Sequence, residues 1–251
     1  MKSLEGKVAI VAGGGRDIGR AVSVELAEQG AKVVVNYFNN EEEGAATLAA
    51  IKEAGGEATA IPGDMTKQED VDALVAKAVE TYGDKIDILI NVVGGLVARK
   101  TIAEADADWF EFVVRLNLTT TFMTTKAVVP YMGEGGAIVN FASQAGRDGG
   151  GPGAWAYACS KGAVQTLTRG LAKELGPSGI RVNCVCPGMI STTFHDTFTK
   201  DEVRKNVAAA TPLRREGQAR EVADLVTYLA SPASSFLTGT SVDINGGMYF
   251  S

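Results

Sequence analysis

Tyr157 and Lys161 are the two residues of this 251-residue chain whose types and spacing point most directly to chemistry. They stand four positions apart in the segment YACSK, so on a helix they would lie one turn apart on the same face. An ammonium about 4 Å from a phenol is strong enough to bring the pKa of the phenol from ~10 to about 7. We therefore interpret Tyr157 as a general acid or base that is tuned by Lys161. Taken alone, the pair also fits an ordinary solvated helix face, so its meaning depends on the rest of the chain.

Ser143 and Asn117 are the polar residues that would act beside this pair. Ser143 follows the apolar run GAIVNFA, and its hydroxyl would donate a hydrogen bond to the same substrate oxygen. Asn117 lies among apolar neighbours in the segment RLNLT, inside an expected helix. A buried amide that is satisfied by the backbone is the alternative interpretation of Asn117.

Strands and helices alternate along the chain, and this order would position the four side chains. Apolar, β-branched runs predict strands at residues 7–12, 31–35, 58–61, 86–90, 136–142, 180–186 and 240–244. Helical spacing predicts helices at residues 16–30, 41–54, 67–82, 106–132, 155–175 and 219–230. The alternation is typical of a parallel sheet with helices on both faces. We expect one α/β domain over residues 1–251, with a Rossmann-type, doubly wound sheet of about seven strands.

The first strand is followed at once by the glycines at 13–15 and then by a helix. A strand, a glycine run and a helix present backbone N–H groups and a helix N-terminus to a phosphate. The spacing is not the literal G-x-G-x-x-G fingerprint, so a glycine-rich turn without a ligand is the alternative. Ligands of such sheets bind at the carboxyl ends of the strands, where Asp64, Asn91 and Ser143 also stand.

The residues after the second strand bear on which dinucleotide would bind. An NAD site usually offers a carboxylate to the ribose 2′-hydroxyl at this point, but Asn36 and Tyr37 stand there instead. Arg16 in the glycine loop could meet a 2′-phosphate, whereas Asp17 and the glutamates at 41–43 add negative charge nearby. The glutamates also suit the first turn of a helix. We expect NADP(H) or NAD(H) as the cofactor, with NADP(H) slightly favoured.

Composition narrows the functional classes. The net charge of −6 argues against a nucleic-acid partner, and no apolar stretch approaches the ~20 residues that a membrane span needs. There is a single histidine, His195, which argues against a Ser-His-Asp triad and a histidine-rich metal site, so we expect no metal. Cys159, Cys184 and Cys186 lack the spacing of metal ligands or of disulfides. We interpret them as buried thiols of a cytoplasmic protein.

Residues 189–212 interrupt the alternation of strands and helices. Segments of this kind that follow the end of a strand often form a lid over a substrate. We therefore expect a substrate lid at about 189–212, with His195 as a candidate substrate contact. A histidine on an ordinary surface is the alternative.

Together these segments resemble the short-chain dehydrogenase/reductase family, in its one-domain branch of about this length. The likeness covers residues 7–247. The family's glycine motif corresponds to AGGGRDIG at 12–19, with Ala12 where threonine is usual and Asp17 where the second glycine is usual. The family's motif after the fourth strand corresponds to NVVG at 91–94 and keeps only its first and last residues.

The resemblance implies an NAD(P)-dependent oxidoreductase that acts on CH–OH or C=O groups. Its catalytic residues would be Asn117, Ser143, Tyr157 and Lys161. Lys161 would also hold the nicotinamide ribose, and Asn117 would hold a water that passes protons to Lys161. The resemblance also implies a homotetramer built partly from the helices at 106–132 and 155–175. It places the cofactor against Gly13, Gly15, Arg16, Asp17, Ile18, Gly19, Asn36, Tyr37, Asp64, Met65, Asn91, Gly94, Tyr157, Lys161, Pro187, Gly188, Ile190 and Thr192.

Polar and cationic loop residues bear on the small-molecule substrate; they are Gln144, Arg147, Arg99 and His195. Arginines near a carbonyl site suggest an anionic or hydroxyl-rich substrate, although they also pair with protein carboxylates. The loops QAGRDGGGPGA and PGMISTTFHDTF are similar to those of reductases that act on keto uronates from alginate breakdown. We therefore expect reduction of a keto-deoxy sugar acid. The alternatives are a 3-oxoacyl-[acyl-carrier-protein] reductase, a glucose-type sugar dehydrogenase, and a non-catalytic nicotinamide-binding sensor, which the intact Ser/Tyr/Lys set argues against.

Overall fold

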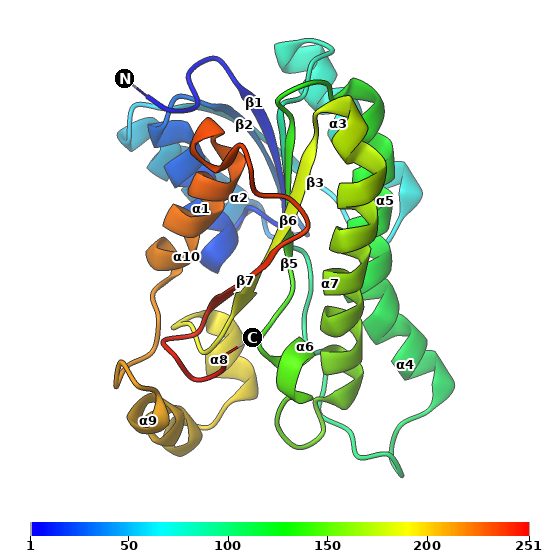
Figure 1. Ribbon diagram of the computed structural model, residues 1–251, viewed down its shortest axis with the longest axis vertical. Helices are drawn as coiled ribbons and strands as arrows, with labels where there is room; N and C mark the ends of the chain where they lie inside the picture. Colours follow the sequence, from blue (N-terminus) through cyan, green and yellow to red (C-terminus); the bar gives the residue numbers. More distant parts are fainter. Residues whose placement is uncertain (1, 251) are drawn as a thin grey trace.

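Seven parallel strands form a single sheet in the computed structural model, which describes residues 2–250 (Figure 1). The strands are β1 (Val8–Ala12), β2 (Lys32–Tyr37), β3 (Glu57–Pro62), β4 (Ile88–Asn91), β5 (Ala137–Phe141), β6 (Arg181–Pro187) and β7 (Ser241–Ile244). Their order across the sheet is β3-β2-β1-β4-β5-β6-β7, and each pairing is parallel. The chain winds outward in both directions from β1 and β4, so the sheet is doubly wound, as predicted. In such sheets the ligand crevice lies at the carboxyl ends of the strands where the direction reverses.

Helices cover both faces of the sheet (Figure 1). One layer holds α1 (Asp17–Glu28), α2 (Glu41–Glu53) and α10 (Ala219–Ala230). The other holds α3 (Gln68–Tyr82), α4 (Ala107–Val114), α5 (Thr120–Val128) and α7 (Trp155–Leu175). Within residues 2–250, none of the helices combines the length and the apolar character needed to cross a bilayer.

Burial on two faces explains why the strands are apolar at every position instead of alternating. In β1, Ala9 and Val11 belong to the core that includes α1 and α10, whereas Ile10 and Ala12 belong to the core that includes α3. All four are almost completely buried. Both faces of the strand are therefore removed from water, as is usual for a parallel sheet with helices on both sides.

The cysteines divide into two kinds. Cys184 and Cys186 are buried in β6, as predicted, but Cys159 is exposed on α7. The prediction of three buried thiols is therefore wrong for Cys159, because the outward face of an amphipathic helix carries that position.

The helix predicted over residues 106–132 is interrupted in the middle. After α4 ends at Val114, residues Arg115–Thr119 form a π-helical turn, η1, before α5 begins. A short 3₁₀ turn, η2 (Val129–Tyr131), follows α5, and similar turns, η3 (Gly176–Ser178) and η4 (Pro232–Ser234), follow α7 and α10. Asn117 lies in η1 and is fully buried. Single π turns occur frequently at functional sites.

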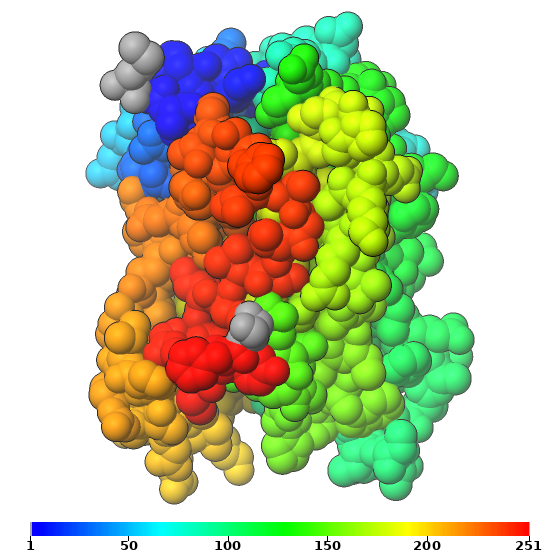
Figure 2. Space-filling view, viewed as in Figure 1, coloured from blue at the N-terminus to red at the C-terminus, as the bar shows by residue number. Residues whose placement is uncertain are grey.

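Short helices gather at the carboxyl ends of the strands (Figure 1). α6 (Ala145–Asp148) follows β5, while α8 (Thr193–Phe198) and α9 (Asp201–Ala210) occupy most of the segment predicted to be a lid. Figure 2 shows the gold surface of α8 and α9 on one side of this end of the molecule and the green surface around α6 on the other. The segment at 189–212 is therefore helical and lies at the edge where such sheets bind ligands.

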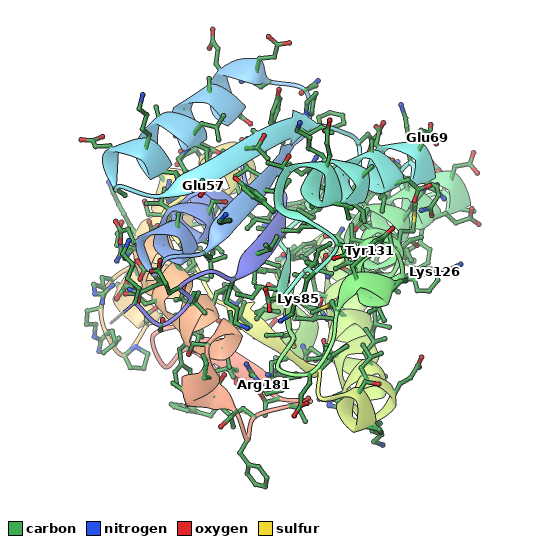
Figure 3. The ribbon with its side chains drawn as sticks, turned by 90° about the horizontal axis from the view of Figure 1, so that it is seen from above. Glu57, Glu69, Lys85, Lys126, Tyr131 and Arg181 are labelled. Atoms are coloured by element: carbon green, nitrogen blue, oxygen red, sulfur yellow. The ribbon has the colours of Figure 1, made fainter. Side chains whose placement is uncertain are left out.

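The opposite end of the sheet is visible in Figure 3, where Lys85 precedes β4 and Arg181 begins β6. The Arg181 guanidinium donates hydrogen bonds to the carbonyl oxygens of Leu229 (2.8 Å) and Ser231 (3.0 Å). Because these carbonyls lie at the end of α10, the arginine ties that helix to the sheet.

Candidate active site

The loop between β1 and α1 is shaped by glycines that leave its backbone open. A Cβ on Gly19 would lie 1.9 Å from the Gly13 carbonyl oxygen, and a Cβ on Gly13 would lie 3.0 Å from the Val93 nitrogen. Arg16, the N-cap residue of α1, makes no side-chain cap bond. The first N–H groups of α1 are therefore available to a phosphate group. These features fit the diphosphate of a nicotinamide dinucleotide.

A cavity of about 950 Å³ runs from this loop along the carboxyl edge of the sheet. The predicted catalytic residues Ser143, Tyr157 and Lys161 line it. So do all the residues predicted for the cofactor except Asn91. Other apolar lining residues were not predicted as contacts; they include Leu96, Val97, Phe112, Met189, Phe194, Phe198, Val207 and Met248.

Two asparagines expected at the cofactor are held by the protein itself. Asn36 lines the cavity, but its Oδ1 accepts a hydrogen bond from the Gly13 N–H (3.1 Å), so its side chain supports the glycine loop. Asn91 donates to Asn140 Oδ1 (2.9 Å) and accepts from the Thr124 hydroxyl (2.6 Å). Asn91 is not among the residues that line the cavity, and its amide joins β4, β5 and α5, so its contact with the cofactor stays a prediction.

Helix α7 places Tyr157 and Lys161 on one face, as their spacing predicted. The Lys161 Nζ lies 5.8 Å from the centroid of the Tyr157 ring. The same nitrogen is buried and donates a hydrogen bond to the Phe141 carbonyl oxygen (2.7 Å) at the end of β5. The Ser143 Oγ, just beyond β5, accepts a hydrogen bond from the Ala145 N–H (3.2 Å). One strand end and one helix therefore bring the three side chains together.

Burial sets the protonation of this pair. It lowers the pKa of the Lys161 amine to about 8. It also raises the pKa of the Tyr157 phenol, against the lowering effect of a hydrogen bond with Ser143. The prediction that Lys161 brings the pKa of Tyr157 down is therefore not met, because loss of solvent outweighs any effect of the ammonium, which points to Phe141. At neutral pH the phenol is protonated and the amine is mainly charged, as proton donation to a carbonyl requires.

Asn117 lies behind this pair and does not line the cavity. Its amide donates to the Gly95 carbonyl (2.8 Å) and the Val113 carbonyl (2.9 Å), and its Oδ1 accepts from the Gly95 N–H (2.9 Å). A Cβ on Gly94 would lie 2.6 Å from the Asn117 Oδ1 and 2.8 Å from the Lys161 Nζ. Glycine at position 94 therefore lets Asn117 and Lys161 approach the same backbone from two sides. The satisfied amide matches the alternative interpretation of Asn117, and its side chain positions the loop beside Lys161.

Helix α8 brings aromatic side chains to the end of the cavity near Tyr157. The Phe194 ring centroid lies 6.1 Å from that of Tyr157 and 5.2 Å from that of Phe198. His195 also lines the cavity, and its Nδ1 lies 3.0 Å from the Thr199 hydroxyl. Burial, followed by the positive charge of Arg204, lowers the pKa of His195, so the imidazole is neutral at pH 7.

The remaining predicted substrate contacts, Gln144 and Arg147, have different fates. Gln144 lines the cavity and donates to the Asp148 carboxylate (3.0 Å), which also lines it. Arg147 does not line the cavity: its Nε bonds the Asp243 carboxylate (3.2 Å) and its Nη2 bonds the Ser241 carbonyl (2.9 Å). Its guanidinium fastens α6 to β7, so nothing in the structure supports the predicted substrate contact of Arg147.

Arg99 lines the cavity and contacts the end of α8. Its guanidinium donates to the carbonyl oxygens of Pro152 (2.9 Å) and Phe198 (3.4 Å). Within residues 2–250, no carboxylate lies within ion-pair distance of Arg99. In the part of the chain that the structure describes, its positive charge therefore has no paired carboxylate.

Val97 is a cavity residue that sequence patterns could not have revealed. Its φ is +65°, and the Ala98 N–H donates to the Leu96 carbonyl (2.8 Å) across it. A β-branched residue in such a tight turn is strained, and strain of this kind concentrates at functional sites. A signal did exist for Phe194 and Phe198, which are four residues apart and share a helix face.

Comparisons with known proteins agree with this site. Residues 12–249 match the family model described as Enoyl-(Acyl carrier protein) reductase. The uncharacterized oxidoreductase YgfF of Escherichia coli is 38% identical over 250 residues, which cover 96% of this chain and 99% of that protein. A 3-oxoacyl-[acyl-carrier-protein] reductase of Synechocystis is 36% identical over 253 residues, which cover 99% of each protein.

Solved structures show the same relationship. A dehydrogenase/reductase from Sinorhizobium meliloti superposes with a TM-score of 0.94 at 34% identity, covering 99% of this chain and 97% of that one. A short-chain dehydrogenase/reductase from Serratia marcescens gives a TM-score of 0.92 at 33% identity, covering 98% and 99%. With the doubly wound sheet, the open glycine loop and the Ser143, Tyr157 and Lys161 cluster, these likenesses show that the chain belongs to the short-chain dehydrogenase/reductase family, whose members are NAD(P)-dependent oxidoreductases acting on CH–OH or C=O groups.

Proposed function

We propose that this protein reduces the carbonyl group of a small, polar, anionic substrate, and that the substrate is a keto-deoxy sugar acid of the keto-uronate class. The observation that supports the anionic class is Arg99, which lines the cavity with a charge that no described carboxylate neutralises. Guanidinium groups in this situation bind carboxylates well. The hydroxyls of a sugar acid would find the Gln144 amide and the Asp148 carboxylate at the same end of the cavity.

The three clustered side chains divide the work of the reaction between them. When bound, the nicotinamide cofactor supplies the hydride. The Ser143 hydroxyl donates a hydrogen bond to the substrate oxygen, and Tyr157, which burial keeps protonated, gives that oxygen its proton. The Lys161 ammonium contributes positive charge beside the phenol, while Asn117 holds the Gly94–Gly95 backbone against it.

We favour NADP(H) slightly over NAD(H). The Arg16 side chain is well exposed at the cavity, and the residues at the end of β2, Asn36 and Tyr37, offer no carboxylate to a ribose 2′-hydroxyl. Glu43 lines the same region, and Asp17 lies 3.9 Å from the Arg16 guanidinium, so the preference is a narrow one.

The segment at 189–212 is proposed to act as the substrate lid. α8 lies at the carboxyl edge of the sheet, and Phe194 packs near the Tyr157 ring, which supports this role. The proposed assembly is a homotetramer in which the α4–α5 region and α7 form part of the contacts. Phe112 and Phe122, which are about half exposed, support such a contact face. A monomeric mass in solution scattering would exclude it.

A second candidate is reduction of a 3-oxoacyl thioester carried on acyl carrier protein. The 36% identity to the Synechocystis 3-oxoacyl-[acyl-carrier-protein] reductase favours this reading. The apolar lining formed by Leu96, Phe194 and Phe198 would also accommodate an acyl chain.

Initial rates with NADPH and NADH against a panel of carbonyl compounds would test both candidates. The panel holds a keto uronate from alginate digestion, an acetoacetyl thioester and simple keto acids, with glucose oxidation measured in the reverse direction. We expect the highest kcat/KM on the keto uronate and a modest preference for NADPH. A rate confined to the thioester would replace the sugar-acid proposal with the second candidate.

A further inference from the structure

Asp17, the first residue of α1, reaches across to Thr193, the first residue of α8. Its Oδ1 accepts a hydrogen bond from the Thr193 N–H (3.1 Å), and its Oδ2 accepts one from the Thr193 hydroxyl. Thr192, the N-cap residue of α8, makes no side-chain cap bond. Asp17 therefore supplies, from 176 residues away, the cap that α8 lacks in its own sequence.

α8 depends on contacts of this kind. It has only six residues, which is too short for a helix to be stable alone. Arg99 binds the Phe198 carbonyl at its other end (3.4 Å). Both ends of α8 are therefore tied to residues that line the cavity, and between them Phe194 is held near Tyr157.

The charge of Asp17 gives this contact a second consequence. The carboxylate lines the cavity beside the open N-terminus of α1, where the diphosphate of the cofactor fits. Like charges repel there, but Thr193 donates to both carboxylate oxygens, and the Arg16 Nη1 lies 3.3 Å from the Thr193 hydroxyl oxygen. If α8 moves away, the carboxylate loses these donors and faces the diphosphate uncompensated.

We propose that Asp17 is a positioning residue that latches α8 over the cofactor cleft, so that breaking the Asp17–Thr193 contact controls the exchange of the nicotinamide dinucleotide. The proposal rests on the proposed role of residues 189–212 as a lid. The backbone agrees with a special role, since Asp17 has a φ of +49°, in the left-handed region that favours glycine. The contact with Thr193 offsets the strain of an aspartate at this position.

Limited trypsin digestion of the cofactor-free protein tests the latch directly. Lys200 and Lys205 are exposed next to α8 and within α9, so cleavage at these sites reports lid opening. Asp17→Gly and Thr193→Val should each be cut about tenfold faster there than the wild type, because the first loses both charge-assisted hydrogen bonds of the contact and the second loses the one from the hydroxyl. Thr193→Ser keeps both donors and should be cut at the wild-type rate. The double variant should be no faster than Asp17→Gly, because Asp17→Gly already removes both hydrogen bonds of the contact.

Two outcomes of the digestion would overturn the latch. One is a cleavage rate within twofold of wild type in both Asp17→Gly and Thr193→Val. The other is an equal rise in cleavage at sites throughout the chain, which would indicate a general loss of stability. Asp17→Gly is a useful partner variant here, because glycine accepts the positive φ and therefore protects the fold of the loop.

Dissociation of the reduced cofactor links the latch to exchange. NADPH, or NADH if it binds more tightly, is loaded and then displaced by excess oxidised cofactor while its fluorescence is followed. Thr193→Val should release it about tenfold faster, whereas Asp17→Asn should change the rate less because the amide oxygen still accepts from Thr193. Unchanged release from Thr193→Val would overturn control of exchange by the latch. Neither measurement uses a substrate, so failure of the keto-uronate proposal leaves both results valid.

Discussion

The two ends of the parallel sheet differ in how their ionisable side chains are paired with other protein groups. At the amino end, Asp87 is buried but accepts hydrogen bonds from the Lys7 Nζ (2.9 Å) and the Val8 N–H (3.0 Å). At the carboxyl end, Lys161 is buried and Tyr157 is partly buried, and both residues line the cavity. Burial at one end is compensated by the protein, and burial at the other leaves groups that a ligand can engage.

The pKa values express this difference. Burial alone would raise the pKa of Asp87, but the hydrogen bonds from Lys7 and Val8 bring it below its usual value. For Lys161 and Tyr157, burial prevails and disfavours the charged form of each. Ionisable groups whose pKa values are shifted by burial are typical of functional sites. Substitutions at the two ends should therefore separate stability from catalysis.

The largest expected effect is that of Tyr157→Phe on turnover. The variant loses the proton donor, so kcat for carbonyl reduction should fall by about 10²–10⁴-fold. Its free energy of unfolding in urea should change by no more than about 1 kcal/mol, since one hydrogen bond is lost. Initial rates and cofactor fluorescence on the same preparation provide the measurement. A variant that turns over at nearly the wild-type rate would remove Tyr157 from its proposed role.

Asp87→Ala should have the opposite effects to Tyr157→Phe: a larger loss of stability and no change in turnover. It leaves the buried Val8 N–H and the partly exposed Lys7 amine without their partner, so the free energy of unfolding should fall by about 1–3 kcal/mol, with kcat unchanged. The pKa of Asp87 is lowered on folding, so its contribution is complete above the unfolded value of ~3.9 and disappears as the pH falls through the folded value. The gap between wild type and variant should therefore narrow in acid.

A matched control for Asp87→Ala is available at the same carboxylate. Lys85 also pairs with Asp87 (3.3 Å), but its side chain is 66% exposed. Lys85→Ala should therefore cost less than about 1 kcal/mol. Equal losses from the two variants would contradict the view that burial of the pair determines its value.

The fold was predictable because its physical causes are local. Strands that are buried on both faces appear in the sequence as continuous apolar runs, and the helix predicted at 155–175 coincides with α7. The break at Arg115–Thr119 escaped prediction, because a π turn adds a residue without disturbing the apolar spacing enough to be noticed. The edge that carries the site was also predictable, since the carboxyl ends of parallel strands meet.

Side-chain partners from distant segments were the part that could not be predicted. Asn91 bonds Asn140 and Arg147 bonds Asp243, and nothing near either residue in the sequence announces these pairs. The predicted direction of the Tyr157 pKa shift was wrong for a related reason. Spacing revealed the nearby lysine, but the loss of solvent that outweighs it depends on the assembled fold.

The pH dependence of catalysis should report the protonation of Lys161 at the carboxyl end of the sheet. Burial lowers the pKa of Lys161 to about 8, so the free enzyme loses the ammonium above that pH. We expect kcat/KM for carbonyl reduction to fall above pH 8 by up to about tenfold per pH unit. The measurement is kcat/KM against pH at constant ionic strength. A value that stays constant up to about pH 9.5 would contradict the prediction, because Lys161 would then have to remain charged up to that pH.

Stability provides the control for this assignment. An amine whose pKa is lower in the folded than in the unfolded state destabilises the folded protein at any pH below the folded pKa. This destabilisation decreases as the pH rises from the folded pKa toward the unfolded value of ~10.4. The wild type should therefore gain stability above pH 8 relative to Lys161→Met, in which no proton is exchanged. Parallel curves for the two proteins in urea would show that a different group titrates.

The smallest expected effects come from two arginines that a sequence cannot tell apart. Arg147 forms an ion pair with Asp243, and its side chain is only 13% exposed. Arg99 instead binds backbone carbonyls and lines the cavity. Arg147→Ala should lower the free energy of unfolding by about 1–3 kcal/mol and leave KM for the keto uronate unchanged. Arg99→Ala should raise that KM several-fold, to about tenfold at most, with little change in kcat, because a charge that binds the substrate and the transition state equally affects KM alone. The Arg99→Lys variant keeps the charge but loses the bidentate geometry, so an intermediate KM is expected. Arg99→Ala could instead leave KM for the anionic substrate unchanged. That result would mean that Arg99 only holds α8 through the Phe198 carbonyl and that the substrate is a neutral carbonyl compound.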